Sequence, residues 1–312
     1  MIHVEQHGQV LAIRMSRSIF GRPFWWTTAY WVDGLLIDTG PRFAARTLLS
    51  VLQNLHVDQV VITHAHEDQM GGLSAVLRQY PKVTVYASPH TLPFLHDPKR
   101  ITLPFYRRLV WGEPQPCVVG VSLDKVDNLI RTPNYQLRTI ETPGHTLDHI
   151  VLFEPRQRWL FSGDVFVHSQ TSAWAAEADL FGVVSSLRTL AELHPERLFP
   201  SDGRISRTPL PELHGKIGHF LQLIREVARL DALGLSTAEI VLRLFQKEPP
   251  IHFWTLGHYS AANLIDACRS YNALFTQVGY EPAPAPHDDA SDEQTGPSDS
   301  SNWPIDWEDL IG

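Results

Sequence analysis

One short segment of the chain reads Thr63-His64-Ala65-His66-Glu67-Asp68-Gln69-Met70-Gly71-Gly72. It follows the apolar run Gln59-Val60-Val61-Ile62, which predicts a strand, so the segment is expected where that strand gives way to a loop. Two histidines two residues apart, with an aspartate two residues further on, place three side chains of metal-ligand type in one turn. The segment therefore predicts a metal site around His64, His66 and Asp68.

Three other polar motifs also follow apolar, strand-like runs. They are Leu35-Leu36-Ile37-Asp38-Thr39-Gly40, Thr142-Pro143-Gly144-His145-Thr146 and Phe161-Ser162-Gly163-Asp164-Val165. Taken in order, the four motifs resemble those of the metallo-β-lactamase-fold superfamily, which includes glyoxalase II, lactonases, flavodiiron proteins and nucleases. The resemblance is nearest to the lactamase-like, glyoxalase II-like branch. It implies an α/β fold, a four-layer αβ/βα sandwich that holds metal at one edge of its paired sheets.

The resemblance also implies roles for individual residues. The ligands of the first metal ion would be His64, His66, His145 and Asp164. Zinc is the expected ion, with manganese and iron left open. Asp68 would orient the metal-activated water as the catalytic residue and then protonate the leaving group, whereas Asp38 would hold its loop in place. For His149 and His168 two roles stay open, either support of the metal ligands or a purely structural role.

Two positions depart from the family pattern. Gln69 stands where the family has a second-site histidine, and Asp202 stands where it has its last metal histidine. In one reading Asp68, Asp164 and Asp202, helped by the Gln69 carbonyl, form an all-oxygen second site that favours manganese, iron(II) or magnesium over zinc. In the other reading the Gln69 amide donates to Asp202 and fills the vacancy, which leaves one metal ion.

Composition and charge narrow the classes of partner. The 312 residues carry a net charge of -8, but residues 281–312 hold nine acids and no lysine or arginine, which leaves the rest near neutral. We therefore expect a small-molecule substrate, no nucleic-acid partner, and a homodimer as the one assembly left open. No run of 18 apolar residues and no signal peptide are found, and Cys117 and Cys268 lie far apart, so a cytoplasmic, reducing location is expected.

Three regions follow one another along the chain. Residues 1–205 alternate strand and helix signals and are expected to form the catalytic domain, with 91–130 as a lid or insertion. Residues 206–280 predict a helical, winged-helix-like appendage, in which Ser236 and Glu239 form a capping box. Residues 281–312 predict an acidic, mostly disordered tail whose apolar end, 303–311, docks on the body or on a partner.

Shorter patterns predict individual elements of the first domain. Asp33-Gly34 predicts a hairpin turn. The expected strands are 10–13, 27–37, 83–86, 150–153 and 159–161, and the expected helix is 43–55. The aromatic run Phe24-Trp25-Trp26 is expected in a loop, either bordering the substrate cleft or packed on the body.

The function expected from these features is that of a metal-dependent hydrolase acting on a small ester-like bond, such as a thioester or lactone. Two alternatives stay open. One is a mononuclear iron persulfide dioxygenase, and the other is a non-catalytic ligand-binding or regulatory protein of the same fold.

Overall fold

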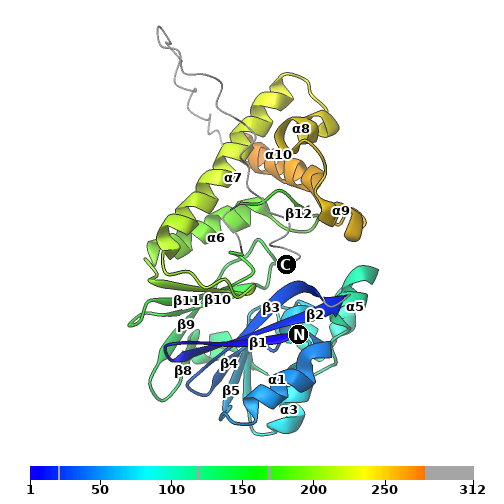
Figure 1. Ribbon diagram of the computed structural model, residues 1–312. Coiled ribbons are helices and arrows are strands. Elements are labelled where there is room, and N and C mark those ends of the chain that lie inside the picture. Colours follow the sequence, from blue (N-terminus) through cyan, green and yellow to red (C-terminus); the bar gives the residue numbers. More distant parts are fainter. Residues whose placement is uncertain (20–21, 118–119, 168–169, 278–312) are drawn as a thin grey trace.

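The structure, a computed structural model, describes residues 1–19, 22–117, 120–167 and 170–277 (Figure 1). Its first sheet has seven strands that follow one another in chain order. The first four strands pair antiparallel, and the pairs from the fourth to the seventh are parallel. The strands are β1 Ile2–His7, β2 Val10–Ile19, β3 Arg22–Val32, β4 Leu35–Ile37, β5 Gln59–Ile62, β6 Thr84–Ala87 and β7 Val121–Ser122.

The second sheet has five strands in the order β13-β11-β10-β9-β8. Within this sheet β11 and β13 pair parallel, with α6 as the crossover between them, and the other pairs are antiparallel. The strands are β8 Leu129–Arg131, β9 Gln136–Glu141, β10 Ile150–Glu154, β11 Trp159–Gly163 and β13 Arg197–Pro200. Two-residue strands form a separate ribbon, in which β12 Trp174–Ala175 pairs with β14 Tyr259–Ser260.

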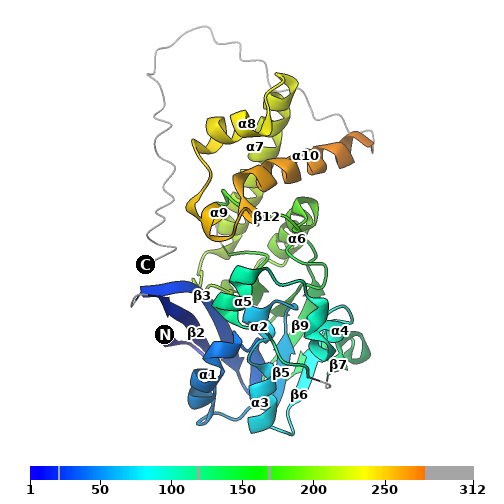
Figure 2. The ribbon, with the colours of Figure 1, turned by 90° about the vertical axis from the view of Figure 1, so that its right-hand side faces the viewer.

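Helices cover the outer face of each sheet. One apolar cluster packs α1 and α3 on the first sheet, a second cluster packs α6 and α7 on the second sheet, and a third fills the space between the sheets (Figures 1 and 2). This is the four-layer α/β arrangement expected from the sequence. The α-helices are α1 Ala45–Leu52, α2 Glu67–Met70, α3 Leu73–Gln79, α4 Leu92–His96, α5 Phe105–Trp111, α6 Leu180–Glu192, α7 Pro209–Ala232, α8 Thr237–Phe245, α9 Pro250–Trp254 and α10 Ala261–Gln277.

Most of the local patterns are found as elements. Asp33 and Gly34 make the β3–β4 turn with positive φ angles of 50° and 88°, a conformation that these two residue types adopt readily. The aromatic run is an exception, because residues 24–26 lie within β3 and not in a loop. A register shift opposite this strand, between Ser16 and Arg17, and the positive φ of Trp25, 57°, interrupt the regular ladder there.

The C-terminal helices share a core with the second sheet. Phe220 of α7, Ile240 of α8 and Leu264 of α10 belong to the same buried cluster as Val151 and Leu160 of β10 and β11. The capping box of Ser236 and Glu239 is present at the start of α8. The winged-helix likeness stays a prediction, and the acidic tail lies outside the described residues. Within the described ranges, no helix is both long and apolar enough to cross a membrane.

A buried lysine in α7 makes the stability depend on pH. Lys216 is 5% exposed and lies over the rings of Phe166 and Phe220, and burial lowers its pKa to about 8 despite the charge of Asp202. Because an unfolded lysine keeps its proton up to a pKa of about 10.5, the unfolded state binds more protons between these values. Stability is therefore reduced below pH 8 and recovers as the pH rises toward 10.5.

We expect the free energy of unfolding of Lys216→Met to exceed that of the parent by a larger margin at pH 7 than above pH 10.5. The change in this margin corresponds to the pKa shift of Lys216 and is roughly 3 kcal/mol. Urea denaturation of both proteins at each pH measures this change. Taking the difference between the two proteins cancels the titration of all other groups. A difference that does not change with pH would show that Lys216 is not desolvated in the folded state.

Candidate metal centre

Four predicted ligands come together at one edge of the two sheets. His64 and His66 follow β5, His145 follows β9, and Asp164 follows β11. One ligand atom from each residue lies within 4.8 Å of the others. The Nε2 atoms of His64 and His145 lie 3.0 and 3.1 Å from Nδ1 of His66, and Oδ2 of Asp164 lies 3.2 Å from His145 Nε2 and 3.4 Å from His64 Nε2. Three nitrogens and a carboxylate oxygen are the donors of a zinc-type ion.

Electrostatics within the group favour a bound cation. Burial opposes ionisation of Asp164, but the three imidazoles outweigh it and hold the pKa of that carboxyl well below its usual range. Burial lowers the pKa of His66 and of His145. For His64 the charge and hydrogen bond of Asp164 outweigh burial and raise the pKa to about 9. One proton thus sits where a cation would bind, and cation binding must release it.

Asp38 supports His64 through a threonine. Its Oδ1 accepts from the backbone N–H of Thr63 at 2.8 Å, and its Oδ2 accepts from the Thr63 hydroxyl at 2.9 Å. That hydroxyl lies 3.0 Å from Nδ1 of His64, whose Nε2 faces the centre. Burial raises the pKa of Asp38 to about 7, against the hydrogen bonds from Thr63. Asp38 therefore fixes the orientation of His64 and does not itself join the group of ligands.

We expect Asp38→Asn to weaken metal binding by about 10–100-fold, because an amide cannot accept both of the bonds that Thr63 donates. Isothermal titration with zinc measures this loss. Asp58→Asn, a change of the same kind at the position before β5, provides the control. Parent-like affinity in Asp38→Asn would show that Thr63 is held without it.

His149 positions Asp164 from the other side. Its Nε2 accepts the backbone N–H of Asp164 at 3.0 Å, and its Nδ1 lies 2.8 Å from the hydroxyl of Thr142. Gly163 makes this approach possible, because a Cβ there would lie 2.6 Å from His149 Nε2 and the residue has a φ of 51°. His149 thus acts in support of the ligands. His168 lies outside the described residues.

The second-site residues make contacts that neither reading of the sequence described. The amide of Gln69 donates to Oδ2 of Asp68 and Oδ1 of Asp164, both at 3.4 Å, and not to Asp202. Asp202 instead accepts from the backbone and side chain of Arg204, at 3.0 and 2.6 Å. Among the described residues, neither Asp68 nor Asp202 belongs to the group of converging ligand atoms. Their roles as second-site ligands stay predictions.

A buried arginine lies beside this region. Arg107 of α5 is 7% exposed, its Nε donates to Oε1 of the fully buried Glu67 at 2.5 Å, and its NH2 lies 3.7 Å from Oδ1 of Asp68. Its NH1 lies 3.5 Å from Nε2 of His66. Arg107 lies in the insertion expected from the sequence, but this contact was not predicted. A signal was available in the i, i+4 spacing of Arg107 and Trp111, the two residues that α5 buries.

The C-terminal region contacts α5 beside the centre. Tyr106, the neighbour of Arg107, has its hydroxyl 2.6 Å from Nδ1 of His258, whose Nε2 lies 2.7 Å from Glu177. Burial raises the pKa of Tyr259, with Arg107 opposing and Asp164 adding to the shift. The ring of Trp25 packs edge-on against Tyr259 and against Trp111 of α5. The insertion thus contacts both β3 and the segment at the start of β14.

Comparison with known proteins agrees with this geometry. A family described as the metallo-beta-lactamase superfamily matches residues 27–202. The beta-lactamase-like protein 2 homolog of Drosophila melanogaster is 27% identical over 241 residues, 72% of this chain and 75% of the fly protein. A hydroxyacylglutathione hydrolase of Legionella pneumophila (strain Lens) is 26% identical over 148 residues, and the match spans 47% of this chain and 49% of that enzyme. The structure of a metallo-beta-lactamase family protein from Thermus thermophilus superposes with a TM-score of 0.61 at 17% identity, covering 87% of this chain and 94% of that one, which supports the fold alone.

Proposed function

This chain belongs to the metallo-beta-lactamase superfamily, and from that premise we propose that it hydrolyses a small thioester with the help of one bound metal ion. The observation that carries the proposal is the convergence of His64, His66, His145 and Asp164. The thioester class is supported by the Legionella relative, whose name describes a hydrolase of an acylated glutathione. A single ion is supported by the contacts of Gln69 and Arg107 beside Asp68.

The four ligands fit one zinc-type ion, because their donor atoms are the right elements and already face one another. Such an ion, when bound, supplies a water of lowered pKa and polarises a carbonyl oxygen. The charge that Asp164 carries among three imidazoles would be neutralised by the same ion. No serine or cysteine nucleophile is needed for the reaction.

The residues beside the ligands can handle the protons. Oδ1 of Asp68 and Oε1 of Gln69 are buried acceptors without a hydrogen-bond partner among the described residues, so they can accept hydrogens from a water molecule. As the water oxygen bonds to the thioester carbon and the carbon–sulfur bond breaks, Asp68 would take the proton and pass it to the departing thiolate.

The test is metal analysis of protein purified without added metal, followed by assays on an S-acylglutathione, an unrelated acyl thioester, a lactone and a phosphodiester. Release of free thiol, lost with a chelator and restored by added metal, is the expected result. Turnover of the lactone or the phosphodiester in place of the thioesters would overturn the substrate class. Oxygen uptake with a persulfide would favour the persulfide dioxygenase function over the proposed hydrolysis.

A further inference from the structure

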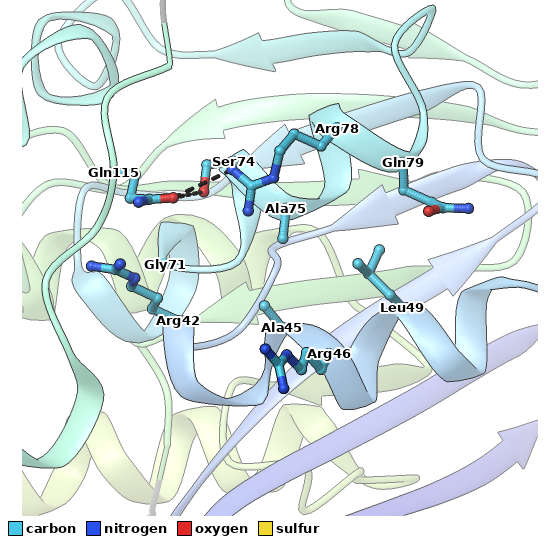
Figure 3. Close-up of a pocket in the computed structure, with 10 residues that line it drawn as sticks. All are labelled: Arg42, Ala45, Arg46, Leu49, Gly71, Ser74, Ala75, Arg78, Gln79 and Gln115. Atoms are coloured by element: carbon cyan, nitrogen blue, oxygen red, sulfur yellow. Dashed lines mark hydrogen bonds between the residues drawn. The ribbon is translucent and has the colours of Figure 1, made fainter.

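A polar hollow lies on the outer face of the first sheet, between α1 and α3. It has a volume of about 480 Å³, and its lining includes Arg42, Arg46 and Arg78 but no acidic side chain. Figure 3 shows these arginines on different sides of a space that has Ala45 and Ala75 between them. None of its lining residues is a ligand of the metal centre.

Among the described residues, no acidic side chain neutralises the charge of this hollow by an ion pair. Within the described part of the chain, no ion pair involves Arg42, Arg46 or Arg78. Arg42 donates to the backbone oxygen of Glu113 at 3.2 Å and Arg78 to Oε1 of Gln115 at 3.4 Å, both of them neutral acceptors.

Small residues create the space. Ala45 and Ala75 are buried, and a Cβ on Gly71 would lie 2.6 Å from the backbone nitrogen of Arg42. The hydroxyl of Ser74, which donates to Gln115, and the half-buried Leu49 complete a mixed polar and apolar wall. The hollow is in the usual size range of small-molecule sites.

The guanidinium group favours an anion of a particular kind. Its planar fork of N–H donors matches two oxygens of a phosphate group, and three such groups suit a ligand with several negative charges. A single carboxylate would leave most of this charge unmatched. We propose that the hollow between α1 and α3 binds a small anion that carries phosphate groups, either an inorganic polyphosphate or the diphosphate of a nucleotide.

A ligand in this hollow would lie behind the segment that carries the metal ligands. Gly71, which lines the hollow, directly follows α2, and the carbonyl of Gln69 within α2 accepts from the backbone and hydroxyl of Thr39 at 2.7 and 2.9 Å. An anion held by Arg42 would therefore lie close to α2, the short helix that directly follows the metal ligands His64 and His66. The site is independent of the proposed thioesterase activity and goes beyond it.

Binding is tested by isothermal titration of the metal-loaded protein with inorganic pyrophosphate and with ADP. Arg46→Gln and Arg78→Gln are expected to weaken binding at least about tenfold each, and added salt should weaken it further. Arg46→Gln should leave the fold intact, because the Arg46 side chain is exposed. Arg225→Gln removes an equal charge from an exposed position on α7 and should bind like the parent.

Pyrophosphate can also bind metal, so His145→Ala serves as a second control. Unchanged affinity in His145→Ala would support the separate site, and loss of binding there would overturn it. Tighter binding of ADP than of pyrophosphate would identify a nucleotide site, and equal binding an inorganic polyphosphate site. Parent-like binding in both arginine variants, or an equal loss in Arg225→Gln, would refute the proposal.

Discussion

His64→Ala is expected to abolish thioester hydrolysis and to weaken zinc binding by more than about a hundredfold. Loss of an outer partner of a metal ligand alone costs about 10–100-fold, and His64 supplies a ligand atom directly. Its ring is fully buried, and its Nε2 lies within 3.4 Å of both His66 and Asp164, so the substitution removes a donor atom from the middle of the group. Metal content after dialysis and isothermal titration measure the loss.

The control is His214→Ala, which removes an exposed histidine of α7 that lies outside the ligand group. This variant should keep the metal content and turnover of the parent. Because His64 carries a raised pKa, zinc affinity of the parent should also rise with pH up to about 9, as the displaced proton becomes easier to lose. Turnover in His64→Ala at the parent's rate would show that the remaining three ligands suffice.

The ligand group could be predicted from sequence because each of its motifs immediately follows a strand. The ends of β5, β9 and β11 meet at one edge of the sandwich, so motifs separated by up to a hundred residues converge there. His64 and His66 lie in the short segment that joins β5 to α2, which leaves their side chains little freedom. The supporting role of Asp38 could be predicted in the same way, because its motif follows β4, the strand that pairs with β5.

The surroundings of the ligands could not be read in the same way. Asp202 is paired locally with Arg204, two residues away, a contact that a family pattern at position 202 does not reveal. Gln69 donates to Asp68, its direct neighbour, whereas one of the two readings had it donate to the distant Asp202. The insertion contains several basic side chains, and its sequence does not show which of them is buried. The face by which α5 packs buries Arg107 and leaves Arg108 exposed.

Arg107→Met is expected to destabilise the protein by about 3–5 kcal/mol, the usual cost of removing one partner from a buried ion pair. Glu67 is fully buried, its Oε2 has no hydrogen-bond partner among the described residues, and Asp68 is 7% exposed. Without the guanidinium, two neighbouring carboxyl groups would remain without a counter-charge in a site that already contains Asp164, and the pKa of Asp68, which burial and the charge of Asp164 raise to about 7, would rise further. Urea denaturation at pH 7 measures the change.

Arg108→Met provides a control on the same helix, because the Arg108 side chain is 54% exposed and pairs with Glu113 at the surface. Its loss should cost less than about 1 kcal/mol. Adding Glu67→Gln to Arg107→Met should restore much of the stability, because the amide does not need a counter-charge.

The substitution Arg107→Met also tests whether the site holds one metal ion or two. If the Arg107 guanidinium takes the place of a second cation beside Asp68, the parent binds one zinc ion per chain, and Arg107→Met binds additional zinc through the carboxylates it exposes. Metal analysis at saturating zinc, with Arg108→Met alongside, measures this. Two ions in the parent, or a stoichiometry unchanged by Arg107→Met, would mean that Arg107 only anchors α5 to Glu67 and that the second site is defined elsewhere.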